Sequence, residues 1–344
     1  MPDFDELYRT YNDQMEDFWF RRANAPKYQK TIHVFGHPVI FDSNHESILE
    51  SATLAEPMYS TTNIQNESTW RIHLTVPSRP VTAPPPQRLI DLIHYVGADD
   101  WLSIDLLEWG NCFVDLKRGE AHGVIAASLA ENPELVSQVL INTILTNMIM
   151  RYGYSMLHAS ALIKDGNILL LQAPHGTGKS TTALRLLLNG YKLLSDSMVY
   201  IGERGDELWM GGFPVGRIKL RKDMLPVFPA LAAEAELEPV RNEIKHRVEL
   251  KRVDSALAYP RMIRIQHVEY CLLERWDKSE SKIDSLAEDE LWPAIMVNSF
   301  HYDTMELWRE NLRKIDLLLK HASLHRLCIG TSEDEILKTV NELW

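Results

Sequence analysis

The chain has 344 residues, of which 45% are apolar and 24% are charged, and its formal net charge is −12. This length exceeds what one hydrophobic core usually serves, so we expect two domains. The negative charge argues against a nucleic-acid partner, because phosphate binding on that scale needs a basic surface that displaces counterions. It does not exclude a local basic pocket for a single nucleotide.

Three cysteines, Cys112, Cys271 and Cys328, form no closely spaced pair. Neither a disulfide framework nor a zinc site is therefore expected, and reduced thiols fit a cytoplasmic protein. Residues 1–20 are acidic and amphipathic, unlike a signal peptide. The most apolar window, 135–157, carries polar residues too densely for a membrane-spanning helix. The sequence thus predicts a cytoplasmic protein without a membrane partner.

The first third of the chain is rich in short β-forming runs. The stretches "TIHVFGHPVIFDS" and "STWRIHLTVPS" predict a small antiparallel sheet, and the second strand would offer an edge to an extended substrate peptide. The prolines at 84–86 predict an extended loop or linker. A short helix is expected at 87–97, followed within 101–119 by two strands that the "WGN" turn joins.

Residues 134–152 repeat apolar side chains with a helical period, which predicts a helix with a broad buried face. Its apolar positions are Leu135, Val136, Val139, Leu140, Ile144, Leu145, Met148 and Ile149. From residue 157 onward the predicted order is strand, loop, helix and strand, which is typical of an α/β domain. Within this region Asp165-Gly166 is a strong turn signal for a β-hairpin.

The stretch "APHGTGKST" follows an uninterrupted apolar run, which predicts a strand buried on both faces. Its glycines let backbone amides turn toward a phosphate, the lysine adds a charge, and the serine hydroxyl can bind Mg²⁺. The alternative is a plain glycine turn, but the flanking strand and helix favour a phosphate site. We assign phosphate binding to Ala173, Pro174, His175, Gly176, Thr177, Gly178, Lys179, Ser180 and Thr181.

One position departs from the phosphate-loop pattern G-x-x-x-x-G-K-[ST], because Ala173 replaces the first glycine. The methyl group removes none of the amide donors that follow. Two further candidates flank the loop. His158 precedes the hairpin that leads into the loop, although a lone histidine is more often structural. Asp196 ends the next apolar run at the same edge of the sheet, where an acid serves a metal, a nucleophile or a turn.

These residues together resemble the P-loop domain of HPr kinase/phosphorylase and its relatives, which include kinases that phosphorylate a serine of peptide precursors. The resemblance lies in the strand at His158, the loop, the helix "TALRLLLNGYKLL" and "SDSMV". A coarser likeness continues through "GGFPVGRIKL", "VEYCLLERW" and "HRLCIGTSEDEILKTV". It implies an α/β P-loop catalytic domain of the HPr kinase and phosphoenolpyruvate carboxykinase type at 135–344, after an α+β recognition or assembly domain at 1–134.

The resemblance also implies an ATP- and Mg²⁺-dependent kinase that phosphorylates a hydroxyl, most simply a serine of a protein or peptide. Asp196 would accept the hydroxyl proton and His158 would orient it, while Lys179 binds phosphate and Ser180 with Asp196 holds Mg²⁺. Ser197 stands where the family carries a second aspartate. The alternative is therefore a nucleotide-binding switch or assembly module without transfer activity. Arg217 and Lys219 are weaker candidates for phosphate or substrate binding, and a homo-oligomer is expected.

Overall fold

The computed structural model describes residues 26–64, 66, 68–77, 83–86, 88–174, 176–240, 243–298 and 304–344. The chain divides into two compact units. Met1–Glu56 and Ile64–Met148 form the N-terminal unit, and Pro57–Asn63 and Ile149–Trp344 form the C-terminal unit. The predicted boundary lay between residues 134 and 135, whereas the structure divides the chain after Met148 and adds a short early segment to the C-terminal unit.

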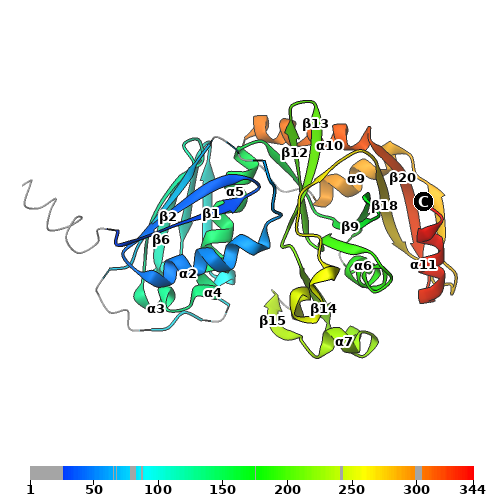
Figure 1. The fold of residues 1–344 in the computed structure, drawn as a ribbon, viewed down its shortest axis with the longest axis horizontal. Coiled ribbons are helices and arrows are strands. Elements are labelled where there is room, and N and C mark those ends of the chain that lie inside the picture. Colours follow the sequence, from blue (N-terminus) through cyan, green and yellow to red (C-terminus); the bar gives the residue numbers. More distant parts are fainter. Residues whose placement is uncertain are drawn as a thin grey trace, which may run out of the picture. The chain divides into compact units, whose positions relative to one another are not determined.

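The N-terminal unit contains one seven-stranded sheet with the strand order β1-β2-β3-β7-β6-β5-β4 (Figure 1). In chain order the strands are β1 (Tyr28–Val34), β2 (His37–Ser43), β3 (Trp70–Thr75), β4 (His94–Ala98), β5 (Trp101–Asp105), β6 (Gly110–Asp115) and β7 (Glu120–Ile125). Because β3 pairs in parallel with both β2 and β7, the sheet is mixed, and the prediction of an antiparallel sheet is wrong.

Two other predictions for this unit need correction. The strand within "STWRIHLTVPS" is β3, which has paired neighbours on both sides and offers no edge to a peptide. The predicted helix at 87–97 is wrong, because the described residues 88–97 form a 3₁₀ turn at Leu89–Asp91 and then enter β4. The apolar residues of this stretch are spaced as on a helix, but the pairing of β4 with β5 supplies the backbone with partners instead. The two strands expected within 101–119 are present as β5 and β6.

Helices pack on this sheet through apolar side chains. They are α2 (Glu46–Ala55), α3 (Ala127–Ala130), α4 (Pro133–Val136) and α5 (Asn142–Arg151), with a π-helical turn at Ser137–Ile141 between the last two. All eight apolar positions that predicted the helix in 134–152 are buried, which confirms its broad apolar face. The π turn shifts the register of that face within an otherwise continuous helix.

The centre of the C-terminal unit is a six-stranded sheet with the order β11-β9-β10-β18-β20-β19 (Figure 1). Its strands are β9 (Ser160–Lys164), β10 (Asn167–Gln172), β11 (Lys192–Ser195), β18 (Val268–Arg275), β19 (Lys282–Ser285) and β20 (Ala322–Ile329). β10, β18 and β20 run parallel, so their carboxyl ends lie at one edge. The predicted hairpin turn is confirmed, because Asp165 and Gly166 both have positive φ between β9 and β10.

Two apolar clusters cover the two faces of this sheet. Alternate residues of β10 and β18 face α9 (Glu288–Asn298) and α10 (Met305–Leu319) on one side. The other residues face α6 (Lys179–Leu187) and α11 (Glu333–Asn341). The uninterrupted run Ile168–Leu171 is buried throughout, as a strand covered on both faces requires. No helix in the described residues is long and apolar enough to cross a membrane.

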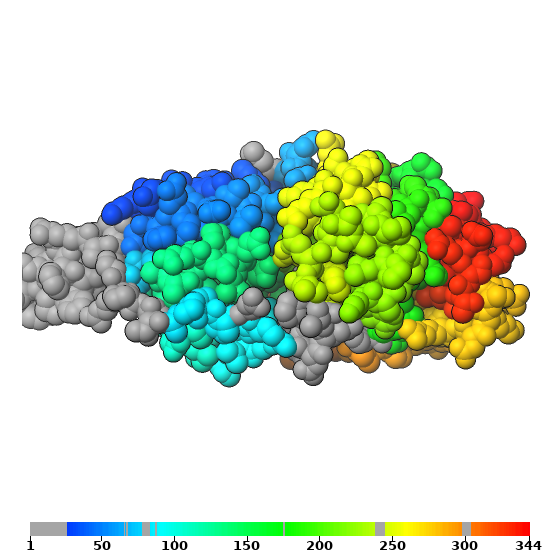
Figure 2. Space-filling model, turned by 90° about the horizontal axis from the view of Figure 1, so that it is seen from below, coloured from blue at the N-terminus to red at the C-terminus, as the bar shows by residue number. Residues whose placement is uncertain are grey.

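Two smaller sheets complete the C-terminal unit. The strands of the first are, in spatial order, β17 (Ile263–Arg264), β13 (Glu207–Phe213), β12 (Met198–Arg204) and β8 (Tyr154–Leu157). The strands of the second are β14 (Arg217–Arg221), β16 (Glu243–Glu249) and β15 (Glu236–Val240). The second sheet and α7 (Pro229–Ala232) form one block of surface, light green to yellow in Figure 2. α8 (Leu250–Val253) follows β16 directly.

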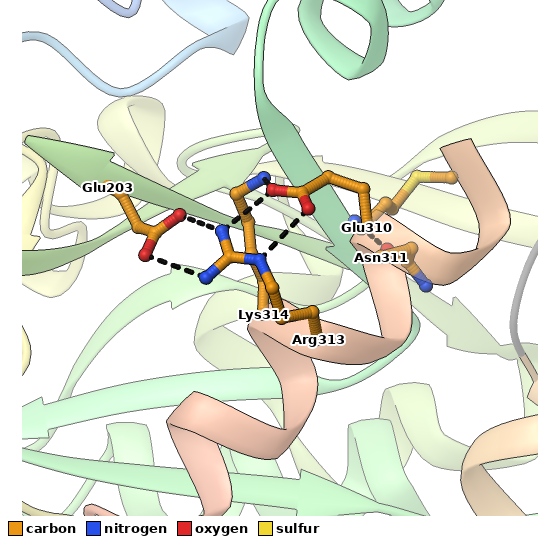
Figure 3. A network of polar contacts seen from close by, with 6 residues as sticks. Glu203, Glu310, Asn311, Arg313 and Lys314 are labelled. Atoms are coloured by element: carbon orange, nitrogen blue, oxygen red, sulfur yellow. Dashed lines mark hydrogen bonds and ion pairs between the residues drawn. The ribbon is translucent and has the colours of Figure 1, made fainter. Parts of the chain in front are cut away.

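Polar contacts fix α10 to β8 and β12, as Figure 3 shows. Arg313 pairs with Glu203 of β12 and with Glu310 of its own helix, and hydrogen bonds from Arg313, followed by Lys314, lower the pKa of Glu310 to about 2. Lys314 is almost fully buried, and its ammonium lies 2.5 Å from Glu310 Oε1. Asn311 Oδ1 accepts the amide of Met156 at 3.1 Å. α10 therefore packs on the C-terminal unit through its buried face, which includes Ile315, Leu318 and Leu319.

The early segment Pro57–Asn63 is built into the C-terminal unit. The Ser60 amide donates to the carbonyl of Gly212 at 3.2 Å, and the Gly212 amide returns a bond to Ser60 Oγ at 2.8 Å. Tyr59 is 1% exposed and stacks on Phe213 with ring centroids 4.6 Å apart. A fragment that begins at residue 135 lacks this segment and leaves Gly212 and Phe213 uncovered.

We expect Tyr59→Ala to lower the free energy of unfolding of the full chain by about 3 kcal/mol, because it removes a buried aromatic ring. A loss of that size lowers the midpoint of thermal unfolding by roughly 10 °C in a unit of this size. Tyr28→Ala, which changes a tyrosine that is 40% exposed, is the matched control and should shift the midpoint little. Equal midpoints for the two variants would show that the early segment does not stabilise the unit.

Candidate phosphate site

The candidate site is built on a strand, a glycine loop and a helix. β10 ends at Gln172 and α6 begins at Lys179, so residues 173–178 form the loop. Gly176 and Gly178 have φ of 79° and 117°, in the left-handed region where a side chain adds strain. Ala173 has no positive φ, and its methyl group is buried in the apolar cluster, so this position has no need of glycine. The strand, loop and helix expected from the sequence are present.

Backbone donors collect where the loop meets the helix. The amides in the first turn of a helix have no intrahelical partner, and the helix dipole places partial positive charge there. In α6 the first intrahelical bond of this turn runs from the Thr182 amide to the carbonyl of Gly178 at 2.8 Å. The amides of Lys179, Ser180 and Thr181 therefore point toward the loop. Such an arrangement suits an anion, and phosphate above all.

The side chain of Lys179 lies at this helix start and contacts His158. Lys179 Nζ is 3.0 Å from His158 Nε2. A charged ammonium has only donors, so Nε2 accepts and the imidazole carries its proton on Nδ1. Burial lowers the pKa of Lys179, the Asp196 carboxylate opposes that shift, and Lys245 adds to it. The structure thus brings His158 beside the lysine of the loop, although the two are distant in sequence.

Asp196 follows β11 and is buried, with 8% of its surface exposed. Ser160 Oγ donates to Asp196 Oδ1 at 2.6 Å, and the Ser180 hydroxyl lies close enough to lower the pKa of this carboxylate. Burial raises the pKa of Asp196, while the Lys179 ammonium and the two hydroxyls lower it. Asp196, Lys179 and Ser180 therefore share one site, as the common edge of the sheet predicts.

The turn that carries Asp196 is held by its neighbours. Ser195 Oγ donates to the carbonyl of Phe213 at 2.9 Å and accepts the amides of Ser197 and Met198 at 3.2 and 3.3 Å. A Cβ on Gly212 would lie 2.4 Å from the carbonyl oxygen of Leu194, so only glycine lets β13 approach β11 here. This packing holds the backbone on both sides of Asp196.

Two residues of the site were not predicted. Ser160 is fully buried and precedes three apolar residues of β9, and a buried hydroxyl in such a strand is a signal that it has a polar partner. Lys245 lies on β16 and acts electrostatically on both Lys179 and Asp196. Nothing in its local sequence indicates this, because β16 reaches the site only through the fold.

The remaining predicted residues lie in the loop, outside the described residues, or on β14. Pro174, Gly176 and Thr177 lie in the loop as expected, whereas His175 lies outside the described residues. Arg217 Nε is 2.6 Å from Glu249 Oε1, so its guanidinium is engaged in an ion pair. Lys219 lies on the same strand, β14, two residues further on.

The carboxylate of Asp196 and the hydroxyl of Ser180 are oxygen ligands of the kind that Mg²⁺ prefers. Mg²⁺ is commonly bound through one or two carboxylates together with substrate phosphates and water. The Asp196 carboxylate and the Ser180 hydroxyl adjoin each other at the start of α6. The described residues include no cluster of three or more His, Cys, Asp or Glu that could hold a metal by itself. One carboxylate and one hydroxyl suit an ion that substrate phosphates help to bind.

Comparison with known proteins gives only distant structural likenesses. No protein-family model matches the sequence, and no curated protein matches it. The chain is similar in fold to the HPr(Ser) kinase/phosphatase from Coxiella burnetii, with 12% identity and a TM-score of 0.30 over 55% of this chain and 95% of that one. At so low a TM-score individual residues cannot be equated, so the roles below rest on the geometry of this chain.

Proposed function

We propose that this protein is an ATP- and Mg²⁺-dependent kinase that transfers the γ-phosphoryl group to a hydroxyl, specifically a serine of a protein or peptide. One observation carries the proposal: a buried carboxylate, Asp196, shares a site with the lysine and the serine that open α6. The loop amides and Lys179 are enough to bind phosphate, and a buried acid beside them adds a group that can hold Mg²⁺ or accept a proton. Phosphoryl transfer to a hydroxyl does need a proton acceptor there.

Each group then has a defined role. The amides of the loop and of the first turn of α6 hold the phosphates, and the Lys179 ammonium neutralises charge on the transferred group. Ser180 and Asp196 would hold Mg²⁺, which supplies charge stabilisation and orientation of the phosphates when bound. As the acceptor oxygen bonds to the γ-phosphorus, the bond to the bridging oxygen breaks, ADP leaves and the hydroxyl proton passes to Asp196.

The contacts of Asp196 suit this role. Ser160 holds one oxygen, Oδ1, from inside the protein, which limits rotation of the carboxylate. Burial raises the pKa of Asp196, and a base with a raised pKa is a better proton acceptor once it is ionised. The Lys179 ammonium favours that ionised form. The family resemblance suggested that His158 orients Asp196; in the structure His158 bonds to Lys179, so we propose that it positions the lysine.

The direct test is transfer of label. Purified full-length protein is incubated with γ-³²P-ATP, Mg²⁺ and a cell lysate, and labelled products are analysed for phosphoserine. We expect label in an acid-stable phosphoester of a discrete protein or peptide. Label confined to inorganic phosphate, together with normal ATP binding, would favour the second candidate, a nucleotide-binding switch or assembly module. Ser197 favours that candidate, because it stands next to Asp196 without adding a second carboxylate.

Ser180→Ala should raise the Mg²⁺ concentration needed for half-maximal activity, because the variant loses a hydroxyl ligand. We expect this Mg²⁺ concentration to rise about tenfold, which is the usual effect of losing one group at a metal site. Ser180→Thr keeps the hydroxyl and should restore the Mg²⁺ dependence of the wild type. The readout is ATPase or transfer rate against Mg²⁺ concentration at saturating ATP. An unchanged Mg²⁺ dependence in the alanine variant would remove Ser180 from the metal site.

Acceptor recognition is assigned to the N-terminal region within this proposal. Every side chain in the reaction scheme comes from the C-terminal unit, which leaves the region 1–134 without a part in the chemistry. The described residues of that region form a sheet with covering helices, a scaffold that can present a binding surface. An N-terminal deletion that retains residues 57–63 should keep ATP hydrolysis and lose transfer to the true acceptor.

A further inference from the structure

β18 extends beyond its neighbour β10 and flanks the phosphate loop. The last residue of β10, Gln172, pairs with Leu272, whereas β18 continues to Arg275. β20 pairs with β18 over that whole extension, up to Arg275 opposite Ile329. The extension is therefore a fixed wall, because its other edge is fully hydrogen-bonded to β20.

A shallow pocket marks the place where wall and loop meet. It has a volume of about 430 Å³ and is lined by Pro174, Gly176, Thr177, Leu273, Glu274 and Arg275. Three of these residues belong to the loop and three to the end of β18. The phosphate loop and the end of β18 thus line the same pocket, although they are about 100 residues apart in the sequence. No local sequence pattern reaches over such a distance.

Arg275 connects the two parts through the backbone of the loop. Its terminal guanidinium nitrogen donates to the carbonyl of Gly176 at 2.7 Å, and its Nε donates to the carbonyl of Thr177 at 3.4 Å. In a trans peptide the carbonyl and the following amide point in opposite directions. Holding the Thr177 carbonyl on the β18 side therefore turns the Gly178 amide away from β18, toward the start of α6.

The same bonds brace the turn before it. The Thr177 amide donates to the Pro174 carbonyl at 3.3 Å, with Gly176 in the left-handed conformation inside this turn. The short bond from Arg275 fixes the peptide that joins Gly176 to Thr177. Without it, a loop of small residues has many accessible conformations, and ordering them on binding would cost affinity.

The Arg275 guanidinium is directed to the phosphate loop. Its neighbour Glu274 lies 3.1 Å from Arg326, in an ion pair of its own. In the described part of the chain the Arg275 guanidinium pairs with no carboxylate, and its hydrogen bonds go to the two loop carbonyls. A full positive charge thus lies directly behind the backbone that would face an anion.

We propose that Arg275 is a positioning residue for the phosphate loop, which it holds in the phosphate-binding conformation before any ligand arrives. The inference rests on the proposed nucleotide site and adds to it a residue that no loop motif contains. Arginine suits this role better than lysine, because its planar fork reaches two carbonyls at once.

The first test uses the full-length protein without ligand. Amide hydrogen exchange is measured over residues 173–182 in wild type, Arg275→Ala, Arg275→Lys and Arg264→Ala. Arg264 is the matched control: it is an exposed arginine in an ion pair with Glu207, on β17. We expect faster exchange of the loop in Arg275→Ala, a smaller increase in Arg275→Lys, and wild-type exchange in the control. Unchanged exchange in Arg275→Ala would overturn the proposal.

The second test measures the dissociation constant of ATP for the same variants and for Lys179→Ala. Arg275→Ala should weaken binding by about 10- to 100-fold, the scale of one lost charge-assisted contact. Arg275→Lys should recover part of that loss, while full recovery would mean that charge alone matters and would refute positioning. If the wild type binds no ATP, the proposed function fails, and the exchange data still decide whether Arg275 holds the loop.

Discussion

Asp196→Asn should reduce phosphoryl transfer by about 100-fold or more while ATP still binds, because the amide keeps the shape of the side chain and cannot accept the hydroxyl proton. The Ser160 hydroxyl can still donate to the amide oxygen, so the local packing stays intact. The measurement is single-turnover transfer from γ-labelled ATP at saturating nucleotide, together with the dissociation constant of ATP.

Ser197→Ala is the matched control for this experiment. It changes the next residue, whose amide, and not its side chain, makes the local bond to Ser195. Its transfer rate should stay within about threefold of wild type, as for a substitution that removes no group from the reaction. If Asp196→Asn transferred phosphate as fast as wild type, Asp196 could not be the proton acceptor. If it lost ATP binding as well, the carboxylate would act in binding, and the experiment would not isolate the chemical step.

Lys179→Ala should abolish most of the thermal stabilisation that ATP confers. A ligand at 100 times its dissociation constant stabilises a protein by about 2.7 kcal/mol, and each tenfold loss of affinity removes about 1.4 kcal/mol of that. The ammonium is the only side-chain cation that the loop motif itself supplies, and it lies at the start of α6. In Lys179→Ala only the backbone amides, Lys245 and Arg275 remain to offset the negative charge of the phosphates. The affinity for ATP should therefore fall by about 100-fold.

The control is Lys192→Ala, an exposed lysine at the start of β11, the end of the strand remote from Asp196. Its ATP-dependent shift should equal that of wild type, which separates the local role of Lys179 from the general loss of a positive charge. An equal shift for wild type and Lys179→Ala would show that ATP binds elsewhere. The lysine and aspartate variants together therefore distinguish a kinase from a nucleotide-binding switch, because only a kinase loses transfer without losing binding.

Much of the local structure followed from the sequence. Asp165-Gly166 predicted the hairpin turn, the apolar run 168–171 predicted the central strand, and the glycine-lysine pattern predicted the loop and the start of α6. Each of these signals lies within a few residues, where turn geometry, side-chain burial and helix capping act directly on the backbone. The proximity of Asp196 to the loop followed from one further rule, the shared edge of parallel strands.

The tertiary structure alone decided the contacts around these elements. Ser160 bonds to Asp196, His158 bonds to Lys179, and Arg275 bonds to the loop across a neighbouring strand. β3 lies inside its sheet and not at an edge, because pairing partners come from distant parts of the chain. Periodicity describes which face of an element is buried, but not which element covers it. Strand order and side-chain partners depend on packing of the whole unit, and they determine which of the residues predicted from sequence share a site.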